Sequence, residues 1–342
     1  MTVSAHQTCY DGEYGGGIIM KKAWQEALYA IWMGMAVPGL ILAFFVVFWE
    51  RNHSASNSEL RTTEASVSLS VLVRWPEGST EWMDMDAYLT GVVLAEMPAY
   101  FESEALKAQA IAARTYAKKA SVTGGKHGDG SVCTDYTCCQ AYQSPEAYLE
   151  KGGSKADLEK VRSAVLDTSG YVLTYEGALI EAVYFSCSGG RTEDAVAVWG
   201  REYPYLRATD SPGEEKAAYY SETKSFRPEE FQQALGVSLT GELAQWMGEV
   251  TRTAGGGVDT MEIGGKKYTG VELRAALGLR STAFTITVQD HLIQVETHGY
   301  GHRVGMSQYG ADAMAAGGAD FRQILSHYYP GTDLEKSLPG NE

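Results

Sequence analysis

Basic side chains are scarce in this sequence. The 342 residues include 28 lysines and arginines against 43 aspartates and glutamates, which gives a formal net charge of −15. A nucleic-acid-binding protein normally shows a basic footprint, so this balance argues against nucleic acid as a partner, although local cationic clefts remain compatible with it. The five cysteines are too few and too unevenly spaced for a disulfide scaffold. The sequence also has no long-period repeat, phosphate-binding loop or dinucleotide fingerprint.

One apolar run is long enough to cross a bilayer. Residues 28–49 carry no charge, and Pro38 near the middle is tolerated in a membrane helix. Lys21 and Lys22 precede the run closely, so the positive-inside rule places the amino terminus in the cytoplasm. No small-residue cleavage site follows, which favours an uncleaved anchor over a signal peptide. We therefore expect a cell-membrane protein with a single N-terminal transmembrane helix followed by an exported domain.

The segments around this run have distinct expected roles. Residues 1–27 form a cytoplasmic N-terminus, and the Ser-, Thr- and Glu-rich residues 50–65 form a linker. Glycine codons are purine-rich, and three glycines stand where a ribosome-binding site would lie, just upstream of Met20. Translation is therefore expected to start at Met20, with residues 1–19 not translated. The folded, exported region is expected at 66–335.

The stretch 86–120 predicts two helices broken at Pro98, because the residue before a proline is pushed out of the helical region. In the first helix an acid shares the apolar face, since four residues follow helical spacing: Leu89, Val92, Val93 and Glu96. Desolvation there would raise the pKa of the Glu96 carboxyl. The alternative is an ordinary solvated Glu at a helix end, and spacing alone favours that alternative.

The second helix is expected to begin with Ser103 as its N-cap. Its alanine-rich body places Lys107 and Arg114 on one face, and Gln109 and Tyr116 on another. Cationic and aromatic side chains beside an acid suit an active site. Lys and Arg on a helix nevertheless mark its solvated face more often than a binding site.

The rest of the folded region is predicted from periodicity and turn residues to be a mixed α+β structure. The expected elements are a strand at 67–73, a helix at 155–170, a hairpin at 171–185, mostly helix at 217–248, a small β elaboration at 254–268, a helix at 270–277, and two strands at 283–288 and 292–296.

A cluster of potential metal ligands lies between these helices and the hairpin. Within a dozen or so residues the sequence places His127, Cys133, Cys138 and Cys139. Thiolate and imidazole are the ligands that zinc prefers, and four candidates suit a closed structural site. The spacing is not a standard zinc-finger pattern. A Cys133–Cys139 disulfide is the competing interpretation, because thiols oxidise outside the membrane.

Two later stretches combine glycines with small polar side chains. The segment 186–193 contains Ser186, Ser188 and Thr192, and its glycines would allow a sugar chain to approach the backbone closely. The segment 298–318 is a glycine-rich turn that leads into a helix, and it contains the polar residues His302, Ser307 and Gln308. Taken alone, both patterns are also typical of ordinary turns.

Together these motifs resemble those of the stage II sporulation protein D family. The run GVVLAEMPAYFESEALKAQAIAARTYA is similar to the family signature, and SCSGGRTE and GYGHRVGMSQYGA are similar to its SxSGGxTE and GxGHGxGMSQxGA stretches. Arg303 departs from the glycine of many members and is expected to add a charge beside the cleft. The resemblance spans about residues 66 to 335, nearly all of the exported part.

The family consists of lytic transglycosylases that act on bacterial peptidoglycan, and a Glu matching Glu96 is their catalytic residue. The resemblance implies cleavage of the MurNAc–GlcNAc β-1,4 bond of denuded glycan strands, with formation of 1,6-anhydroMurNAc. It also implies a glycan-binding cleft and an elaborated second lobe. The residues expected to bind the glycan are Lys107, Gln109, Arg114, Tyr116, Ser186, Ser188, Thr192, His302, Ser307 and Gln308.

The resemblance implies a metal and partners as well. Residues matching His127, Cys133 and Cys139 bind zinc beside the catalytic Glu in some members, while other members lack them. We expect a structural zinc that the chemistry does not require, with Cys138 as the fourth ligand. The implied setting is engulfment during endospore formation, together with a cell-wall amidase and a membrane scaffold (stage II sporulation proteins P and M).

Two other functional classes remain open at this point. One is a two-carboxylate glycoside hydrolase, in which Glu193 or another acid supplies a base or nucleophile. The other is a non-catalytic wall-binding module, since relatives of this domain serve as amidase enhancers. An intact acid at position 96 argues against a purely binding role.

Overall fold

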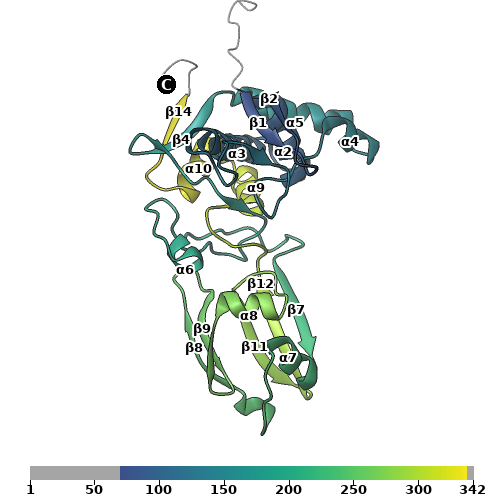
Figure 1. The fold of residues 1–342 in the computed structure, drawn as a ribbon, viewed down its shortest axis with the longest axis vertical. Coiled ribbons are helices and arrows are strands. Elements are labelled where there is room, and N and C mark those ends of the chain that lie inside the picture. Colours follow the sequence, from purple (N-terminus) through teal and green to yellow (C-terminus); the bar gives the residue numbers. More distant parts are fainter. Residues whose placement is uncertain (1–69, 337–342) are drawn as a thin grey trace, which may run out of the picture. The chain divides into compact units, whose positions relative to one another are not determined.

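A computed structural model describes residues 70–336 of the chain (Figure 1). The chain divides into two compact units, Met1–Ser66 and Val67–Glu342, and all described residues belong to the second. The expected transmembrane helix, the linker and the proposed start at Met20 lie outside the described residues. Among residues 70–336, the structure contains no helix that is both long enough and apolar enough to cross a bilayer.

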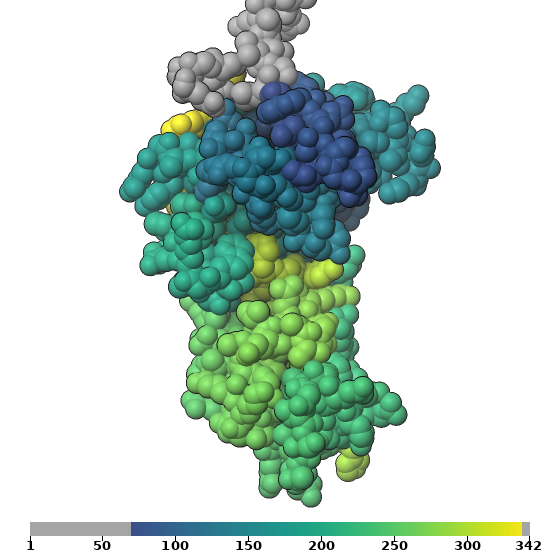
Figure 2. Space-filling view, viewed as in Figure 1, coloured from purple at the N-terminus to yellow at the C-terminus, as the bar shows by residue number. Residues whose placement is uncertain are grey.

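The described residues form a mixed α/β structure, as the sequence predicts, with two separate hydrophobic cores. The first core is formed mainly by residues of α2, α3, α5, α9 and α10 with strand β1. The second core is formed by residues of α7, α8 and strands β9–β12. In Figure 2 the green part of the chain, which contains the elements around the second core, lies apart from the blue part that contains α2 and α3.

The elements contributed by the first half of the described chain are β1 (Ser70–Arg74), β2 (Thr80–Asp84), α2 (Met85–Glu96), α3 (Ser103–Thr123), β3 (Val132–Cys133), α4 (Pro145–Glu150), α5 (Lys155–Asp167), β4 (Tyr171–Tyr175), β5 (Ala178–Leu179), β6 (Tyr184–Phe185) and α6 (Ala195–Trp199). The second half contributes β7 (Ser221–Phe226), α7 (Pro228–Leu235), the 3₁₀ turn η1 (Leu243–Gln245), β8 (Met247–Arg252), β9 (Val258–Ile263), β10 (Lys266–Thr269), α8 (Gly270–Ala276), β11 (Phe284–Gln289), β12 (Leu292–His298), β13 (Met306–Ser307), α9 (Gln308–Ala316), α10 (Phe321–Tyr328) and β14 (Asp333–Lys336).

Helix α2 begins and ends where its sequence requires. The Asp84 carboxylate accepts a hydrogen bond from the Ala87 N–H at 2.8 Å and so caps the first turn. Its apolar face, with Leu89, Val92 and Val93, is fully buried in the first core. After Glu96 the backbone becomes extended at Met97 (φ −121°, ψ 140°), as expected for the residue before Pro98. This arrangement leaves Glu96 at the last position of the helix.

Helix α3 packs its alanine-rich faces against α5, α9 and α10, and it ends at Gly124, whose φ of 85° is the left-handed conformation that favours glycine. Ser103 is not the N-cap as expected. Glu102 occupies that position, so Ser103 is the first helical residue. The Glu102 N–H donates to the Asp312 carboxylate on α9 at 2.7 Å. A tertiary contact therefore helps fix this end of the helix, which local sequence could not reveal.

Two three-stranded sheets, β10-β9-β8 and β11-β12-β7, form the second core together with α7 and α8. The strands expected at 283–288 and 292–296 and the helix at 270–277 are confirmed as β11, β12 and α8. The expectation of mostly helix at 217–248 is wrong in part, because Ser221–Phe226 is strand β7, paired with β12. Its sequence, SETKSF, lacks an apolar alternation, so pairing with β12 decides its conformation.

Short backbone pairings bring the two glycine-containing motifs side by side. Strand β6 pairs in parallel with β13, joining Tyr184 to Met306 and Phe185 to Ser307. A bridge between Cys187 and Tyr300 continues this contact. The segments 184–193 and 298–308, more than a hundred residues apart in sequence, therefore meet next to the first core.

Candidate active site around Glu96

Glu96 lies half-buried at the end of α2, on the same face as the buried Leu89 and Val92. Its Oε1 accepts a hydrogen bond from the Ala141 backbone N–H at 2.8 Å. Burial raises the pKa of the Glu96 carboxyl, and the hydrogen bonds from Ala141 and the Gln308 side chain oppose that rise only in part. The sequence-based expectation of a desolvated acid at this position is confirmed.

The surroundings of Glu96 are polar but uncharged. Within residues 70–336, no charged side chain contributes to the pKa of Glu96. Two phenols lie close enough to be affected by its charge, those of Tyr88 and Tyr184. Gln140 connects the two phenols, since it accepts from the Tyr88 hydroxyl at 3.2 Å and donates to the Tyr184 oxygen at 2.9 Å. The carboxyl is thus poised to hold a proton rather than to pair with a cation.

Two glutamines from separate motifs meet beside Glu96. Ser307 caps α9 by accepting the Gly310 N–H at 3.3 Å, and this places Gln308 in the first turn of the helix. The Gln308 amide lies 3.5 Å from the Gln109 Oε1 on α3. The Gln109 Nε2 is buried and has no hydrogen-bond partner. Gln109 is fully buried, so no ligand can reach this nitrogen in this structure, and its role is to position Gln308.

His302 packs between two aromatic rings, with centroid distances of 5.6 Å to Phe185 and 5.4 Å to Trp199. Burial, with a smaller contribution from the positive charge of Arg274, lowers the pKa of His302 to about 4. Its Nδ1 accepts the Val304 N–H at 3.1 Å. The imidazole is therefore neutral near pH 7 and offers shape and a hydrogen bond rather than a positive charge.

The α3 side chains expected at the glycan are held in other contacts. Arg114 is fully buried and donates to the Thr168 carbonyl at 2.7 Å and to Asp86 Oδ1 at 2.9 Å, so no ligand can reach its guanidinium in this structure. Lys107 forms ion pairs with Glu104 and Asp167, at 3.0 and 3.3 Å. The Tyr116 hydroxyl lies against the Cys139 thiol. Of the four α3 residues proposed from the sequence, Gln109 is the one that the structure brings to Gln308.

The polar side chains of the segment 186–193 are also held in contacts within the protein. The Ser188 hydroxyl is buried and donates to Glu214 Oε2 at 2.9 Å. The Thr192 hydroxyl, also buried, donates to two backbone carbonyls at 3.3 Å. Ser186 is half-buried, and its carbonyl accepts the Tyr309 N–H at 3.0 Å. The segment therefore supports the loop that carries Gln308, and the hydroxyls of Ser188 and Thr192 are engaged within the protein.

Glu193 and Arg303 form a buried pair. The Glu193 carboxylate accepts from the Thr253 hydroxyl at 2.6 Å and from the Gly255 N–H at 3.1 Å, and it lies 3.8 Å from the Arg303 guanidinium. Arg303 is 2% exposed and donates to three backbone carbonyls, those of Ser188, Arg191 and Gly255. The expectation that Arg303 adds a charge beside the cleft is therefore not met, because the charge is buried and paired. Its φ of 64° suits a position where many relatives have glycine.

The four proposed metal ligands converge. The ligand atoms of His127, Cys133, Cys138 and Cys139 all lie within 4.8 Å of one another, and none of these cysteines forms a disulfide. The Cys138 and Cys139 sulfurs are 3.8 Å apart, and they lie 3.8 and 3.6 Å from the His127 Nε2. A tetrahedron with ordinary zinc–sulfur and zinc–nitrogen bonds has edges of about 3.8 and about 3.6 Å. The donor set and its spacing therefore fit zinc.

Sequence reasoning missed the residues that act through the backbone or through a tertiary contact. Ala141 contributes its N–H to Glu96, and no side-chain pattern marks such a role. Glu214 accepts from Ser188, Gly189 and the buried Cys187 thiol, yet it lies outside every motif. Covariation between residues 186–190 and residue 214 in related sequences is the signal that could have indicated this contact.

Comparison with known proteins places these residues in a family context. Residues 77–175 match the family described as "Stage II sporulation protein". The chain is 42% identical to stage II sporulation protein D of Bacillus amyloliquefaciens over 279 residues, which is 80% of each chain. It is 40% identical to stage II sporulation protein D of Bacillus subtilis (strain 168), over 81% of each. An "Amidase enhancer" of Bacillus subtilis (strain 168) is 29% identical over 72% of this chain and 40% of that protein.

Proposed function

Because this chain belongs to the stage II sporulation protein D family of sporulation proteins, we propose that it is a peptidoglycan lytic transglycosylase. The proposed reaction cleaves the MurNAc–GlcNAc β-1,4 bond of denuded glycan strands. The observation that carries the proposal is the half-buried Glu96, whose pKa is raised in an uncharged pocket of amide and phenol groups. A carboxyl of this kind stays protonated long enough to act as a general acid.

Glu96 performs two proton transfers in this mechanism. Its carboxyl first protonates the glycosidic oxygen as the bond to the muramic C1 breaks. The C6 hydroxyl of the same muramic residue then attacks C1, and the Glu96 carboxylate takes the proton that this hydroxyl loses. The products are a 1,6-anhydro end and a free GlcNAc 4-hydroxyl, with no water consumed. The nucleophile belongs to the substrate, so its effective concentration at C1 is high without a second catalytic group.

The charges around Glu96 favour a mechanism with one catalytic carboxyl group over a mechanism with two. A glycosidase of the usual kind needs a second acid about 5 to 10 Å from the first, to act as base or nucleophile. Within the described part of the chain, no other acid influences Glu96. Glu193, the candidate partner, is 1% exposed and already accepts from Thr253 and Gly255. The two-carboxylate hydrolase is therefore the weaker hypothesis.

The Gln308 amide is the proposed substrate contact near Glu96, because it already reaches the carboxyl and is 6% exposed. Gln109 is fully buried, and it positions Gln308 through the 3.5 Å contact between the two amides. Ser307 and His302 then act as positioning residues, because they shape the loop and the helix end that carry Gln308.

We also propose that His127, Cys133, Cys138 and Cys139 hold one structural zinc ion. When bound, the ion supplies only cross-linking, because four protein ligands leave no open position for catalysis. Cys139 is two residues before Ala141, whose N–H contacts Glu96. Fixing this loop fixes the amide that partly stabilises the Glu96 carboxylate, so the zinc site acts on the catalytic residue through the backbone.

The cellular setting is proposed from the family. Residues 28–49 would anchor the protein in the cell membrane with the catalytic region outside, on the mother-cell side of the engulfment intermembrane space. A cell-wall amidase and a membrane scaffold, stage II sporulation proteins P and M, would be its partners. The amidase would supply the denuded strands by removing stem peptides.

A digest of purified glycan strands by the full-length protein tests the proposed reaction. A transglycosylase leaves 1,6-anhydro ends, which are lighter than hydrolysis products by one water and resist borohydride reduction. Reducing ends in the mass spectrum would instead show a hydrolase. No cleavage, combined with stimulation of an added cell-wall amidase, would favour the second candidate, a wall-binding enhancer. The similarity to the protein named "Amidase enhancer" is the observation that keeps this candidate open.

A further inference from the structure

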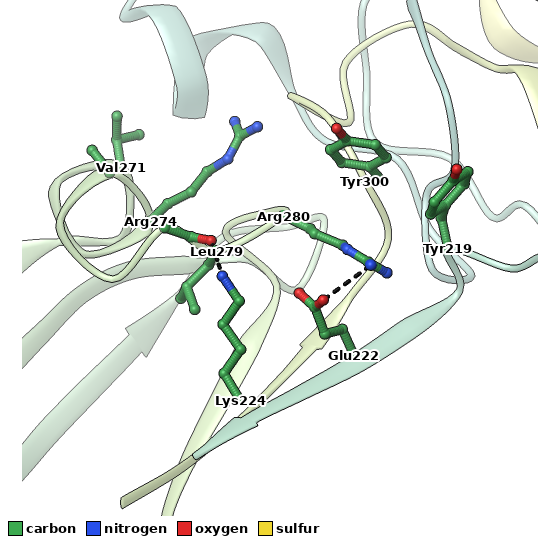
Figure 3. A pocket seen from close by; sticks show the side chains of 10 residues that line it. Tyr219, Glu222, Lys224, Val271, Arg274, Leu279, Arg280 and Tyr300 are labelled. Carbon is green, nitrogen blue, oxygen red and sulfur yellow. Dashed lines mark hydrogen bonds and ion pairs between the residues drawn. The ribbon is translucent and has the colours of Figure 1, made fainter. Parts of the chain in front are cut away.

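A charged pocket lies in the second half of the chain, and apart from Tyr300 its lining residues lie outside the motifs that resemble the family signatures. Its volume is about 690 Å³, and α8 and strand β7 contribute to its wall. The side chains that decide its chemistry are Tyr219, Glu222, Lys224, Arg274, Arg280 and Tyr300. Figure 3 shows Arg274 and Arg280 extending toward the side of the pocket where the two tyrosines lie. None of these residues belongs to the proposed catalytic or zinc sites.

The pocket is cationic in a protein that is acidic overall. Arg280 is neutralised by Glu222 at 3.0 Å, and its guanidinium lies 5.3 Å from the centroid of the Tyr219 ring. The Lys224 ammonium donates to the Gly278 carbonyl. Within residues 70–336, Arg274 alone among these cations has neither an ion pair nor a hydrogen bond. An arginine stays protonated at neutral pH, so Arg274 presents an uncompensated guanidinium to the pocket.

A line of aromatic rings connects the pocket with the region of Glu96. The Tyr300 and Tyr219 centroids are 5.3 Å apart, and Tyr219 lies 6.4 Å from Tyr309. Tyr309 directly follows Gln308 and packs 5.0 Å from Phe101, five residues beyond Glu96. Tyr219 and Tyr300 are 39% and 43% exposed, and the Arg280 guanidinium lies 5.3 and 5.8 Å from their ring centroids, so the remaining part of each ring is open to a ligand. Phe101 is buried, so the rings that a polymer could touch are those of Tyr219 and Tyr300, beside Arg274.

We propose that Arg274 binds the free lactyl carboxylate of a muramic acid residue in the glycan strand, at a subsite several sugars from the cleaved bond. The guanidinium fork matches a carboxylate with two parallel hydrogen bonds. The rings of Tyr219 and Tyr300 supply flat apolar faces for the neighbouring sugars. In a strand that still carries stem peptides, the same lactyl group is a neutral amide and cannot form this pair. Arg274 therefore selects strands from which the peptides have been removed.

This inference rests on the proposed function, because that function identifies the polymer as a glycan strand. A binding experiment tests the Arg274 subsite independently of the cleavage reaction. The full-length Glu96→Gln variant, which should bind without cleaving, is titrated with a GlcNAc–MurNAc tetrasaccharide bearing free carboxylates. The same oligosaccharide with each carboxylate converted to a methylamide is the neutral comparison. We expect the carboxylate form to bind about tenfold more tightly than the methylamide form, because a single charge-assisted hydrogen-bonded contact typically contributes that much to affinity. Adding Arg274→Ala should remove that difference.

Two control variants accompany this test. Arg162→Ala removes the same charge from α5, outside the pocket, and should leave the tenfold preference intact. Arg274→Lys keeps the positive charge but lacks the forked guanidinium, so it should retain part of the preference for the carboxylate oligosaccharide. This variant replaces Arg274→Ala in the test if the alanine variant melts at a lower temperature. Equal losses for the acid and amide forms in Arg274→Ala would overturn the inference. Tighter binding of a glycerol-phosphate oligomer of equal charge would also overturn it, in favour of a phosphate polymer.

The outcomes remain distinguishable from those of the proposed function. A carboxylate preference that depends on Arg274, in a protein whose parent cleaves nothing, would keep this inference and overturn the transglycosylase. Cleavage of glycan to 1,6-anhydro products, with no preference between acid and amide oligosaccharides, would support the transglycosylase and overturn the role of Arg274.

Discussion

Around Glu96, the carboxylate accepts from one backbone amide and one glutamine, with no charged neighbour among the described residues. Around Glu193, the carboxylate accepts from a hydroxyl and backbone amides, and it lies 3.8 Å from Arg303. Both acids belong to motifs that resemble family signatures. Burial without a compensating charge raises the pKa of the Glu96 carboxyl, whereas Glu193 lies in a buried ion pair with Arg303.

Burial alone therefore does not identify a catalytic acid. Glu193 is the more deeply buried of the two, at 1% exposure, yet its oxygens have partners on all sides. Glu96 is only half-buried, so a ligand can reach it, and burial still raises the pKa of its carboxyl. A raised pKa at an acid that stays accessible and has no charged neighbour is the stronger sign of a reactive site.

The largest expected effect is the loss of turnover in Glu96→Gln. The amide keeps the shape and hydrogen bonding of the carboxyl but cannot exchange the proton, so glycan cleavage should fall about a hundred- to ten-thousand-fold. Glycan binding and the folded state should survive. The exposed Glu159→Gln on α5 is the matched control and should cleave at the parent rate. Parent-rate cleavage by Glu96→Gln would remove Glu96 from the mechanism.

Glu193→Gln should show the opposite behaviour. It leaves Arg303 buried without its anion, so the free energy of unfolding in urea should fall by about 3 kcal/mol. The folded fraction should still cleave glycan within about tenfold of the parent, because Glu193 touches no substrate. A variant of unchanged stability that has lost turnover would instead make Glu193 the second carboxylate of a hydrolase.

Zinc removal should have an intermediate effect, mainly on stability. Zinc at about a thousand times its Kd stabilises the folded state by about 4 kcal/mol, so stripping the metal should lower the melting temperature by about 8–16 °C. Cys138→Ser should lower the zinc content measured by atomic emission, whereas Cys187→Ser, outside the cluster, should not. A metal-free protein with a Cys133–Cys139 disulfide in the mass spectrum would contradict this prediction.

The smallest expected effect is a pH-dependent gain in stability for Glu96→Gln. Folding raises the pKa of Glu96, so the folded state binds this proton more tightly than the unfolded state does. The stability that the protonated group contributes is complete below the unfolded pKa and is lost as the pH rises through the folded pKa. The variant should therefore melt higher than the parent at pH 8, by a margin that shrinks toward pH 4. A margin that grows toward low pH would show a lowered pKa.

Much of the first core could be predicted from the sequence, because its features are local. Helical spacing placed Leu89, Val92 and Glu96 on one face, and Pro98 ended the helix. The ligand cluster could be proposed from residue types alone. Strand β7 could not be predicted, because its polar sequence pairs with β12 through contacts about seventy residues away.

The roles of polar residues in the site were harder to predict than the elements. Arg114 and Gln109 lie on the same helix, yet one is buried in an ion pair with Asp86 and the other meets Gln308. Which partner each side chain finds depends on α5 and α9, which approach α3 from different sides of the fold. Residue type and spacing do not contain that information.

Direct titration of the Glu96 carboxyl tests the central claim most directly. Carbon-13 spectra of the glutamate-labelled full-length protein, compared with those of Glu96→Gln, identify the one carboxyl signal that the substitution removes. The account predicts that this signal titrates with a pKa above the ordinary glutamate value of about 4.3. A midpoint at or below that value would contradict the assignment of Glu96 as the proton donor.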